Sequence, residues 1–202
     1  MNHIIIQLGR DNMCGRFYID DDDKEMQVIK SAIERKARDY PENIKLKTGG
    51  DIFPTDLVPV QTGLDQYESM KWGFAGFDGK PVINARSETA LQKPMFQKSM
   101  LERRCLIPAS GYYEWQKSGS RKIQFRFHRP GGLLYLAGCF RQEKNSGIFN
   151  FVILTAQAVN GLEVIHDRMP VIIPHDHINT WLNESPDAAE YAIRDLAYEA
   201  VQ

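Results

Sequence analysis

The middle of the chain, from Gly49 to Leu154, is built from short apolar runs separated by Gly, Pro and polar turns. Runs of this length between turn residues are typical of β-strands. The gaps between them are too short for crossover helices, so we expect mostly antiparallel pairing. The predicted strands are Leu57–Val60, Val82–Ala85, Tyr112–Trp115, Ile123–His128, Leu133–Cys139 and Phe149–Leu154.

Helical patterns flank these strands. The acidic run Asp20–Asp23 precedes apolar residues spaced three and four apart, which predicts an amphipathic helix with carboxylates at its positive end. Its apolar positions are Met26, Ile29, Ile33 and Ala37. Further helices are expected over Met95–Arg103 after Pro94, over His177–Leu182 after Pro174, and over Asp187–Ala200 with Asp187 as N-cap. No repeat or linker interrupts the chain, which predicts a single α+β domain with a mostly antiparallel, barrel-like β core and flanking helices.

Charge and cysteine content limit the function. The 202 residues include 25 Lys and Arg against 26 Asp and Glu, so any contact with nucleic acid needs a local basic patch. Three cysteines, Cys14, Cys105 and Cys139, show no CxxC spacing and follow no secretory leader, which favours a reducing, cytoplasmic location. The apolar run Ile4–Ile6 is too short to cross a bilayer, so we expect no membrane role.

Four segments contain residues suited to chemistry. They are Met13-Cys14-Gly15-Arg16-Phe17, Asn84-Ala85-Arg86-Ser87-Glu88, Pro108-Ala109-Ser110-Gly111-Tyr112-Tyr113-Glu114-Trp115 and Ile165-His166-Asp167-Arg168-Met169-Pro170. A lone cysteine is more often a small buried hydrophobe than a nucleophile. Cys14 differs because it directly follows Met13, so removal of the preceding residues exposes its α-amine. The ordered set, which spans most of the chain, resembles the signature of the SRAP family (SOS response-associated peptidase), which captures abasic sites.

The resemblance implies a mixed α/β fold with a barrel-like core and a partner, single-stranded DNA containing abasic sites. It implies that Cys14 forms the crosslink as the N-terminal residue, with Asn84, Glu114 and His166 around it. It also places Arg16, Arg86 and Arg168 where the family contacts DNA phosphates. The family usually begins at Met-Cys, whereas twelve residues precede Met13 here. We therefore expect residues 1–13 to be a leader or removed segment, either because translation starts at Met13 or because a cleavage step removes the leader. Residues 14–202 are then expected to be the SRAP-like domain.

The chemistry of an abasic sugar explains why an N-terminal cysteine suits this task. The open form of the sugar is an aldehyde, which condenses with an unprotonated amine. An α-amine has a pKa of about 7.7–8.0 against about 10.4 for lysine, so far more of it is unprotonated at neutral pH. The thiol of the same residue can then attack the imine carbon and close a five-membered thiazolidine ring.

The surrounding residues suit supporting roles in this reaction. His166 can protonate the sugar ring oxygen, because an imidazole titrates near neutral pH. Glu114 can take a proton from the amine or stabilise a cationic imine, and Asn84 can hold a sugar hydroxyl or phosphate. Each of the three residue types is also common in purely structural positions, as a buried histidine, a strand-end carboxylate or a turn asparagine.

Aromatic residues and histidines complete the candidate set. Relatives often carry a second tryptophan after a Trp-Gly pair, whereas here Trp72-Gly73 is followed by Phe77, which we expect to stack on an unpaired base. We expect Trp72 and Trp115 to be core residues. The cluster His175-Asp176-His177 lacks further ligands at structural-zinc spacing, so we expect no metal site and no cofactor.

Three functions remain open on the sequence alone. The chain is an abasic-site crosslinker, a peptidase with Cys14 as N-terminal nucleophile and His166 as base, or a plain single-strand binder. The first two use the same residues, and removal of the leader can be the only peptide cleavage involved. A plain binder does not need Cys14, Asn84, Glu114 and His166 together, which argues against the third. We expect a monomer.

Overall fold

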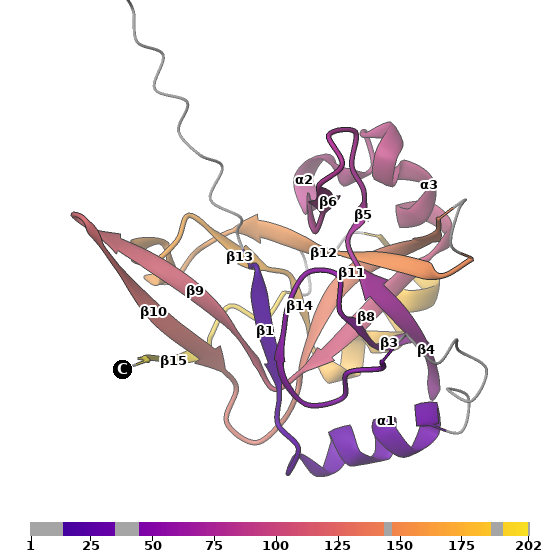
Figure 1. Cartoon of the computed structure of the whole chain (residues 1–202), viewed down its shortest axis with the longest axis horizontal. Coiled ribbons are helices and arrows are strands. Elements are labelled where there is room, and N and C mark those ends of the chain that lie inside the picture. The colour runs from indigo at the N-terminus through magenta and orange to yellow at the C-terminus, as the bar shows by residue number, and fades with distance from the viewer. Residues whose placement is uncertain (1–13, 35–44, 144–146, 187–191, 202) are drawn as a thin grey trace, which may run out of the picture.

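The computed structural model of the chain describes residues 14–34, 45–143, 147–186 and 192–201. At its centre is a closed barrel of five strands, in which each strand pairs with the next in the order β12, β4, β3, β8, β11 and back to β12 (Figure 1). The barrel strands are β3 Leu57–Gly63, β4 Gln66–Trp72, β8 Arg104–Ala109, β11 Leu134–Gln142 and β12 Phe149–Gln157. Closure turns one face of every strand into a shared interior, which is filled by buried side chains.

Short strands extend the barrel around β12 and β11. They are β7 Asn84–Arg86 and β13 Arg168–Pro170, which both pair with β12, and β14 Ile172–Ile173, which pairs with β11. A two-stranded ribbon, β5 Phe74–Ala75 and β6 Pro81–Val82, precedes β7. The pairing of β7 and β13 with the same strand brings the Asn84 and His166 segments, far apart in sequence, to the end of β12.

A second sheet lies against one side of the barrel. Its order is β15-β10-β9-β1-β2, all antiparallel, and the β9–β10 hairpin projects outward at the left of Figure 1. Its strands are β1 Arg16–Ile19, β2 Gly50–Ile52, β9 Gly111–Ser118, β10 Arg121–His128 and β15 Ala197–Ala200. Phe17 of β1 packs on Trp72 of the barrel with ring centroids 5.2 Å apart, so both sheets share one core.

The helices cover the ends of the barrel. They are α1 Lys24–Glu34, α2 Ser87–Ala90 and α3 Pro94–Glu102, with short 3₁₀ turns at η2 Leu162–Val164 and η3 His175–His177 and a π-helical turn at η4 Thr180–Glu184. The predicted apolar face of α1 is confirmed, since Met26, Ile29 and Ile33 are buried; Ala37 lies outside the described residues. Asp23 accepts a hydrogen bond from the Met26 N–H at 3.0 Å and so caps this helix.

The predicted single domain with a barrel-like β core is confirmed, as are the predicted strands and the helix after Pro94. The expectation of mostly antiparallel pairing is also confirmed; two pairs are parallel, since β4 and β7 both run parallel to β12. Parallel pairing requires a long connection. Here β8–β11 and the helices between Arg86 and Phe149 supply it, although no single helix crosses over.

The predicted C-terminal helix over Asp187–Ala200 is wrong in its described part. Residues 197–200 form β15, which covers the outer edge of β10. Tyr198 packs against Phe125 and Phe127, with ring centroids 6.0 and 5.5 Å apart. Pairing with a strand edge satisfies backbone groups on both strands, and this outweighs a weak local helical preference. Asp187 lies outside the described residues.

The segment predicted as a helix over His177–Leu182 is helical. After Pro174 it begins as a 3₁₀ turn and ends as a π-helical turn, so it is not a regular α-helix. Trp181 fixes it to the barrel by donating its Nε1–H to the Cys105 carbonyl at 2.9 Å. No helix in the described part of the chain is long and apolar enough to cross a membrane.

Candidate functional site

Cys14 lies against Glu114 at the start of β1. Antiparallel pairing sets Arg16 opposite Tyr113 of β9, so the residues just before β1 reach Glu114. The backbone N–H of Cys14 donates a hydrogen bond to Glu114 Oε1 at 2.5 Å, and the Cys14 side chain is fully buried. The nitrogen that would become the α-amine therefore already contacts a carboxyl group.

The backbone at Cys14 is strained. Its φ angle is +44°, in the left-handed region that residues with a Cβ rarely adopt. Such conformations cost on the order of 1–3 kcal/mol and persist where surrounding contacts enforce them. The strain is located at the junction between residue 13 and the domain, which is the bond that must break if a leader is removed.

Glu114 is a carboxyl group inside the protein. Side chains alternate along β9, so Tyr112 and Glu114 face the interior while Tyr113 and Trp115 face the other way. Glu114 is 2% exposed, and this burial raises its pKa to about 8, against the lowering effect of hydrogen bonds from the Cys14 and Trp115 N–H groups. At neutral pH the carboxyl group therefore largely keeps its proton while residue 13 remains attached.

This raised pKa predicts that Glu114 destabilises the fold as the pH rises. The folded chain holds the proton up to about pH 8, whereas the unfolded chain loses it near the ordinary pKa of 4.5. Between these values the folded state binds more protons, so the free energy of unfolding falls with rising pH. In protein whose intact mass shows that residue 13 is still attached, Glu114→Gln should increase stability over this window, increasingly toward pH 8.

Chemical denaturation across the same pH range measures the effect, with Glu163→Gln as the control. Glu163 is exposed and lines the same pocket as Glu114, so its replacement should leave the pH dependence of stability unchanged. A pH-independent difference between Glu114→Gln and its parent would mean that the buried carboxyl group titrates normally.

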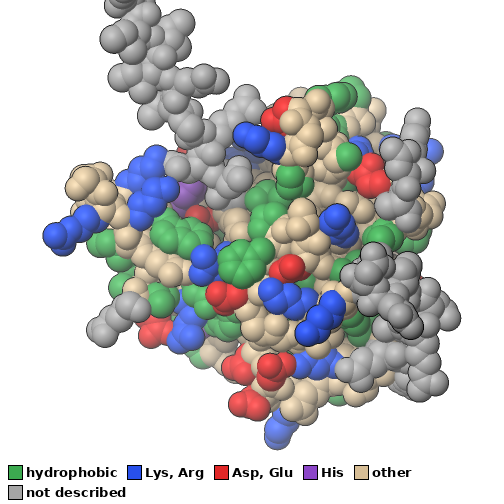
Figure 2. All heavy atoms as spheres, viewed as in Figure 1, with side chains coloured by type: hydrophobic (Ala, Val, Ile, Leu, Met, Phe, Trp, Pro, Cys, Tyr) green, Lys and Arg blue, Asp and Glu red, His purple; other side chains and the backbone are tan. Residues whose placement is uncertain are grey.

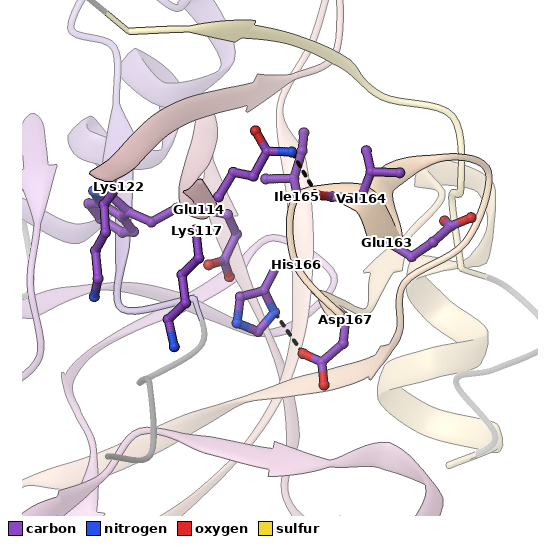
Figure 3. Close-up of a pocket in the computed structure, with 10 residues that line it drawn as sticks. Glu114, Lys117, Lys122, Glu163, Val164, Ile165, His166 and Asp167 are labelled. Carbon is purple, nitrogen blue, oxygen red and sulfur yellow. Dashed lines mark hydrogen bonds and ion pairs between the residues drawn. The ribbon is translucent and has the colours of Figure 1, made fainter. Parts of the chain in front are cut away.

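His166 faces the pocket that Glu114 borders (Figure 3). This open pocket has a volume of about 340 Å³ and lies between the β9–β10 hairpin and the loop before β13. The Nδ1 atom of His166 has two neighbours: the Arg168 N–H, at 3.1 Å, and the Asp167 carboxylate, at 3.0 Å. A neutral ring can accept from Arg168, and a protonated ring can donate to Asp167. These contacts orient the imidazole ring through Nδ1.

The Cys14 thiol is not a ready nucleophile in this state. Burial raises its pKa well above the ordinary value, and the neighbouring Glu114 raises it further. Catalytic cysteines of peptidases instead have a lowered pKa next to a cation or a helix N-terminus. The surroundings of Cys14 therefore favour chemistry that begins at its nitrogen.

Arg16 is surrounded by aromatic rings. Its guanidinium lies 4.8 Å from the ring centroid of Phe53, 5.5 Å from that of Tyr113 and 5.2 Å from that of Trp115. Asp51 is 3.4 Å away. The prediction that Trp115 is a core residue is wrong, because it is half-buried and lines the pocket, on the face of β9 opposite Glu114. Trp72 is fully buried, as predicted.

The other predicted residues are arranged around β12 or on its neighbours. Asn84, at the start of β7, pairs with Ile153, and the exposed Arg86 pairs with Thr155. Arg168 of β13 donates to both carboxylate oxygens of Glu88, at 2.6 and 2.9 Å, and to the Thr155 carbonyl. Asn84 lies outside the lining of the pocket that Glu114 and His166 share.

Phe77 is fully exposed, at the turn of the β5–β6 ribbon. Its ring therefore packs on none of the core side chains. In the described residues, no group of three or more His, Cys, Asp or Glu side chains is arranged to hold a metal ion. His177 pairs with Asp176 at 3.0 Å in the 3₁₀ turn η3.

Comparison with known proteins identifies the family of this chain. Residues 13–201 match the family described as SOS response associated peptidase (SRAP). The chain belongs to this family. The abasic site processing protein YedK of Escherichia coli is 30% identical over 187 residues, covering 88% of this chain and 83% of YedK. YoaM of Bacillus subtilis, also named an abasic site processing protein, is 36% identical over 118 residues. That alignment covers 56% of this chain and about half of YoaM, 52% of its length.

Solved structures show the same fold. A protein from Bacteroides thetaiotaomicron aligns with a TM-score of 0.73 over 94% of this chain and 92% of its own, at 21% identity. A protein from Bordetella bronchiseptica aligns with a TM-score of 0.72 over 94% of this chain and all of its own, at 22% identity. At this level of identity the likeness concerns the fold alone.

The sequence patterns of this SRAP chain did not identify three pocket residues, and all three lie on the β9–β10 hairpin. Gln116, Lys117 and Lys122 line the pocket beside Glu114. Lys and Arg side chains gather at the outer end of this hairpin, at the left of Figure 2, while Asp and Glu side chains gather near the start of α1. The signal was present as Lys117, Arg121 and Lys122 around a Gly-containing turn, a local basic patch on a chain of net charge −1.

Proposed function

We propose that this chain captures abasic sites in single-stranded DNA through an N-terminal Cys14, as a cytoplasmic protein that works without a cofactor. The observation that supports this most is the 2.5 Å contact between the Cys14 nitrogen and the buried Glu114, beside a pocket that His166 lines. The relatives named above are abasic site processing proteins, which supports the same activity here.

In the proposed reaction the α-amine of Cys14 adds to the open aldehyde of the abasic sugar. Loss of one water gives an imine, and the thiol of the same residue adds to the imine carbon while its proton passes to nitrogen. The product is a thiazolidine, in which both the nitrogen and the sulfur of Cys14 are bonded to the former aldehyde carbon. An internal cysteine or a lysine has only one of the two nucleophiles and cannot close this ring.

Glu114 and His166 move the protons. A free amine next to Glu114 shares one proton with the carboxyl group, so Glu114 can take the proton that must leave before the amine attacks. His166 faces the pocket and can protonate the sugar ring oxygen as the ring opens. Asn84 offers an uncharged amide to a sugar hydroxyl or phosphate, at the β7 end that adjoins β12.

The same residues can expose the amine. Attack of the Cys14 thiol on the carbonyl of residue 13 converts the peptide bond into a thioester, and water then releases the leader as a carboxylic acid. The protonated Glu114 can give its proton to the departing Cys14 nitrogen, and bond cleavage releases the backbone strain at Cys14. A single slow turnover suffices, so the raised pKa of the thiol is compatible with this step.

The DNA contacts proposed are few and local. Arg16 and Arg86 present guanidinium groups to phosphates, and Phe77 presents a fully exposed ring to an unpaired base. Arg168 already holds the Glu88 carboxylate with both arms of its fork, which is also how arginine binds a phosphate. Arg168 would therefore contact DNA by exchanging Glu88 for a phosphate.

These contacts predict a shallow dependence of DNA affinity on salt. Each phosphate neutralised on a single strand releases about 0.7 counterions, so Arg86→Ala should reduce the slope of log affinity against log salt by about that amount. The measurement uses an oligonucleotide with a tetrahydrofuran lesion, which has no aldehyde and reports binding alone. Arg129→Ala is the control, because Arg129 is also exposed but lies near Asp20 on another surface. An unchanged slope in Arg86→Ala, or tighter binding to intact duplex, would contradict the proposed path.

The direct test of the proposed function is incubation of the protein with an oligonucleotide that carries one true abasic site, followed by denaturing electrophoresis. A heat- and SDS-stable adduct should form with the single strand and not with the undamaged strand. The competing function, a peptidase that cleaves other proteins, needs many turnovers, and the raised pKa of the Cys14 thiol is unfavourable for repeated attack. Cleavage of unrelated peptides without any adduct would favour that alternative.

A further inference from the structure

A second cavity shares no lining residue with the Glu114 pocket and none with the β9–β10 hairpin. Its volume is about 460 Å³, and it is bordered by α1, the β3–β4 turn, β11 and η3 and open to solvent on one side. The apolar side chains of Val28 and Leu64 line it and are 69% and 59% exposed. The cavity therefore offers apolar surface that is open to solvent.

The lining carries a negative charge. Glu25, Asp65 and Asp176 contribute carboxylates, and no Lys or Arg is among the described residues that line the cavity. Glu25 accepts a hydrogen bond from the Tyr135 hydroxyl, and Asp176 pairs with His177, so two of these carboxylates are held in position. Such a surface repels DNA phosphates and attracts cations.

A buried acceptor in the same lining points to a ligand that donates hydrogen bonds. Gln61 is 4% exposed, and its Nε2 donates to the Gly63 carbonyl at 3.2 Å. This bond fixes which end of the amide is nitrogen, because two facing oxygens would repel each other. Among the described residues nothing donates to Gln61 Oε1, which is an unusual state for a buried polar atom.

The backbone explains how this side chain reaches the cavity. The register between β3 and β4 shifts between Gln61 and Gly63, which marks a bulge at the end of β3. Bulges redirect side chains and are common beside binding sites. The phenol rings of Tyr67 and Tyr135 line the same space, and Tyr135 also makes an edge contact with the His175 ring, with centroids 6.0 Å apart.

We propose that this cavity binds an organic cation carried on an apolar stem, an alkylguanidinium or alkylammonium group. The carboxylates would hold the charge, and the apolar and aromatic side chains would cover the stem. Gln61 Oε1, which has almost no accessible surface in this structure, would accept one N–H group after a small movement of the amide. This chemistry is that of an Arg or Lys side chain on a partner protein, and equally that of a small free amine. The site is independent of the crosslinking reaction.

The test is calorimetric titration of the full-length protein with agmatine, which carries a guanidinium on a four-carbon stem, and with n-butanol, which has the stem without the charge. Agmatine should bind and butanol should not. Glu25→Gln should weaken agmatine binding about tenfold, because it removes a charged partner. Asp176→Asn should weaken it about two- to fivefold, because Asp176 is an exposed carboxylate and exposed ion pairs contribute less. Asp22→Asn removes an exposed carboxylate outside the cavity and should have no effect.

Gln61→Leu should also weaken agmatine binding, in protein whose fold is checked by its thermal melt; the two rim variants decide the question if this variant does not fold. A capped Ala-Arg-Ala peptide that binds more tightly than agmatine would identify the source as a protein segment, and the reverse order would identify a small amine. Equal binding of agmatine and butanol, or agmatine binding that neither rim variant changes, would overturn the proposal. Cys14→Ala should leave agmatine binding intact, so failure here is distinct from failure of the crosslinking function.

Discussion

Cys14→Ala should abolish the heat- and SDS-stable adduct with abasic single-stranded DNA. The alanine variant lacks the thiol that closes the thiazolidine ring, and it also lacks the thiol that would release residues 1–13 and expose the amine. Denaturing electrophoresis with a labelled abasic oligonucleotide measures the loss. Because a covalent bond is either formed or not, we expect the adduct to fall below detection.

The chain supplies its own controls for this experiment. Cys105 and Cys139 are free, buried thiols on the neighbouring strands β8 and β11, so Cys105→Ala and Cys139→Ala should both retain the adduct. Cys14→Ser, if its leader is removed, keeps an α-amine and should give a reversible imine that only borohydride makes permanent. A stable adduct in Cys14→Ala would eliminate Cys14 as the reacting residue.

Glu114→Gln and His166→Ala should slow adduct formation far more than they weaken binding to undamaged single strands. Proton transfer by a positioned side chain typically accounts for about 10²- to 10⁴-fold in rate, and we expect losses in this range. Glutamine retains the shape of Glu114 and can still accept the Cys14 N–H bond, so the fold should survive. Single-turnover kinetics with an abasic strand, alongside binding to its undamaged counterpart, separate the two quantities.

Glu163→Gln and His175→Ala are matched controls for these variants. Glu163 is an exposed carboxylate in the same pocket, and His175 lies in the second cavity. Neither should change the rate. If Glu114→Gln lost binding and rate to the same extent, a structural role for the carboxyl group would be indicated. We expect Glu114→Gln to form the adduct slowly and to be more stable than its parent at pH 8. The two results together would indicate that the carboxyl group serves the reaction rather than the stability of the fold.

The sequence predicted the elements that depend on local patterns. Alternating apolar runs between turns located β3, β9, β10, β11 and β12, and three-and-four spacing located α1. It did not predict how β12 pairs with β7 and β4, because parallel pairing joins segments far apart in the chain. The same limit explains β15, whose strand conformation depends on the free edge of β10 rather than on its own residues.

The candidate site shows the same division. The resemblance picked out Cys14 and Glu114, and the structure brings them into contact across a hundred residues of sequence. It did not reveal that Glu114 is buried, because strand alternation alone does not say which face of β9 meets the core. Trp115 was assigned to the core because aromatic side chains in strands usually lie there, whereas it lies on the opposite face, against Arg16. Arg168 reaches Glu88 because β13 and β7 both pair with β12. This pairing joins distant segments of the chain, so local sequence patterns do not predict the Arg168–Glu88 ion pair.

The central claim is that the functional chain begins at Cys14, and intact mass spectrometry of the purified adduct tests it most directly. We predict a species that lacks residues 1–13 and whose mass equals that of the chain from Cys14 plus the abasic oligonucleotide minus one water, as thiazolidine formation requires. Peptide mapping should place the DNA on the residue that is now N-terminal. An adduct of equal stability that retains residues 1–13 would contradict the account, because its Cys14 nitrogen would still be an amide and no thiazolidine could form.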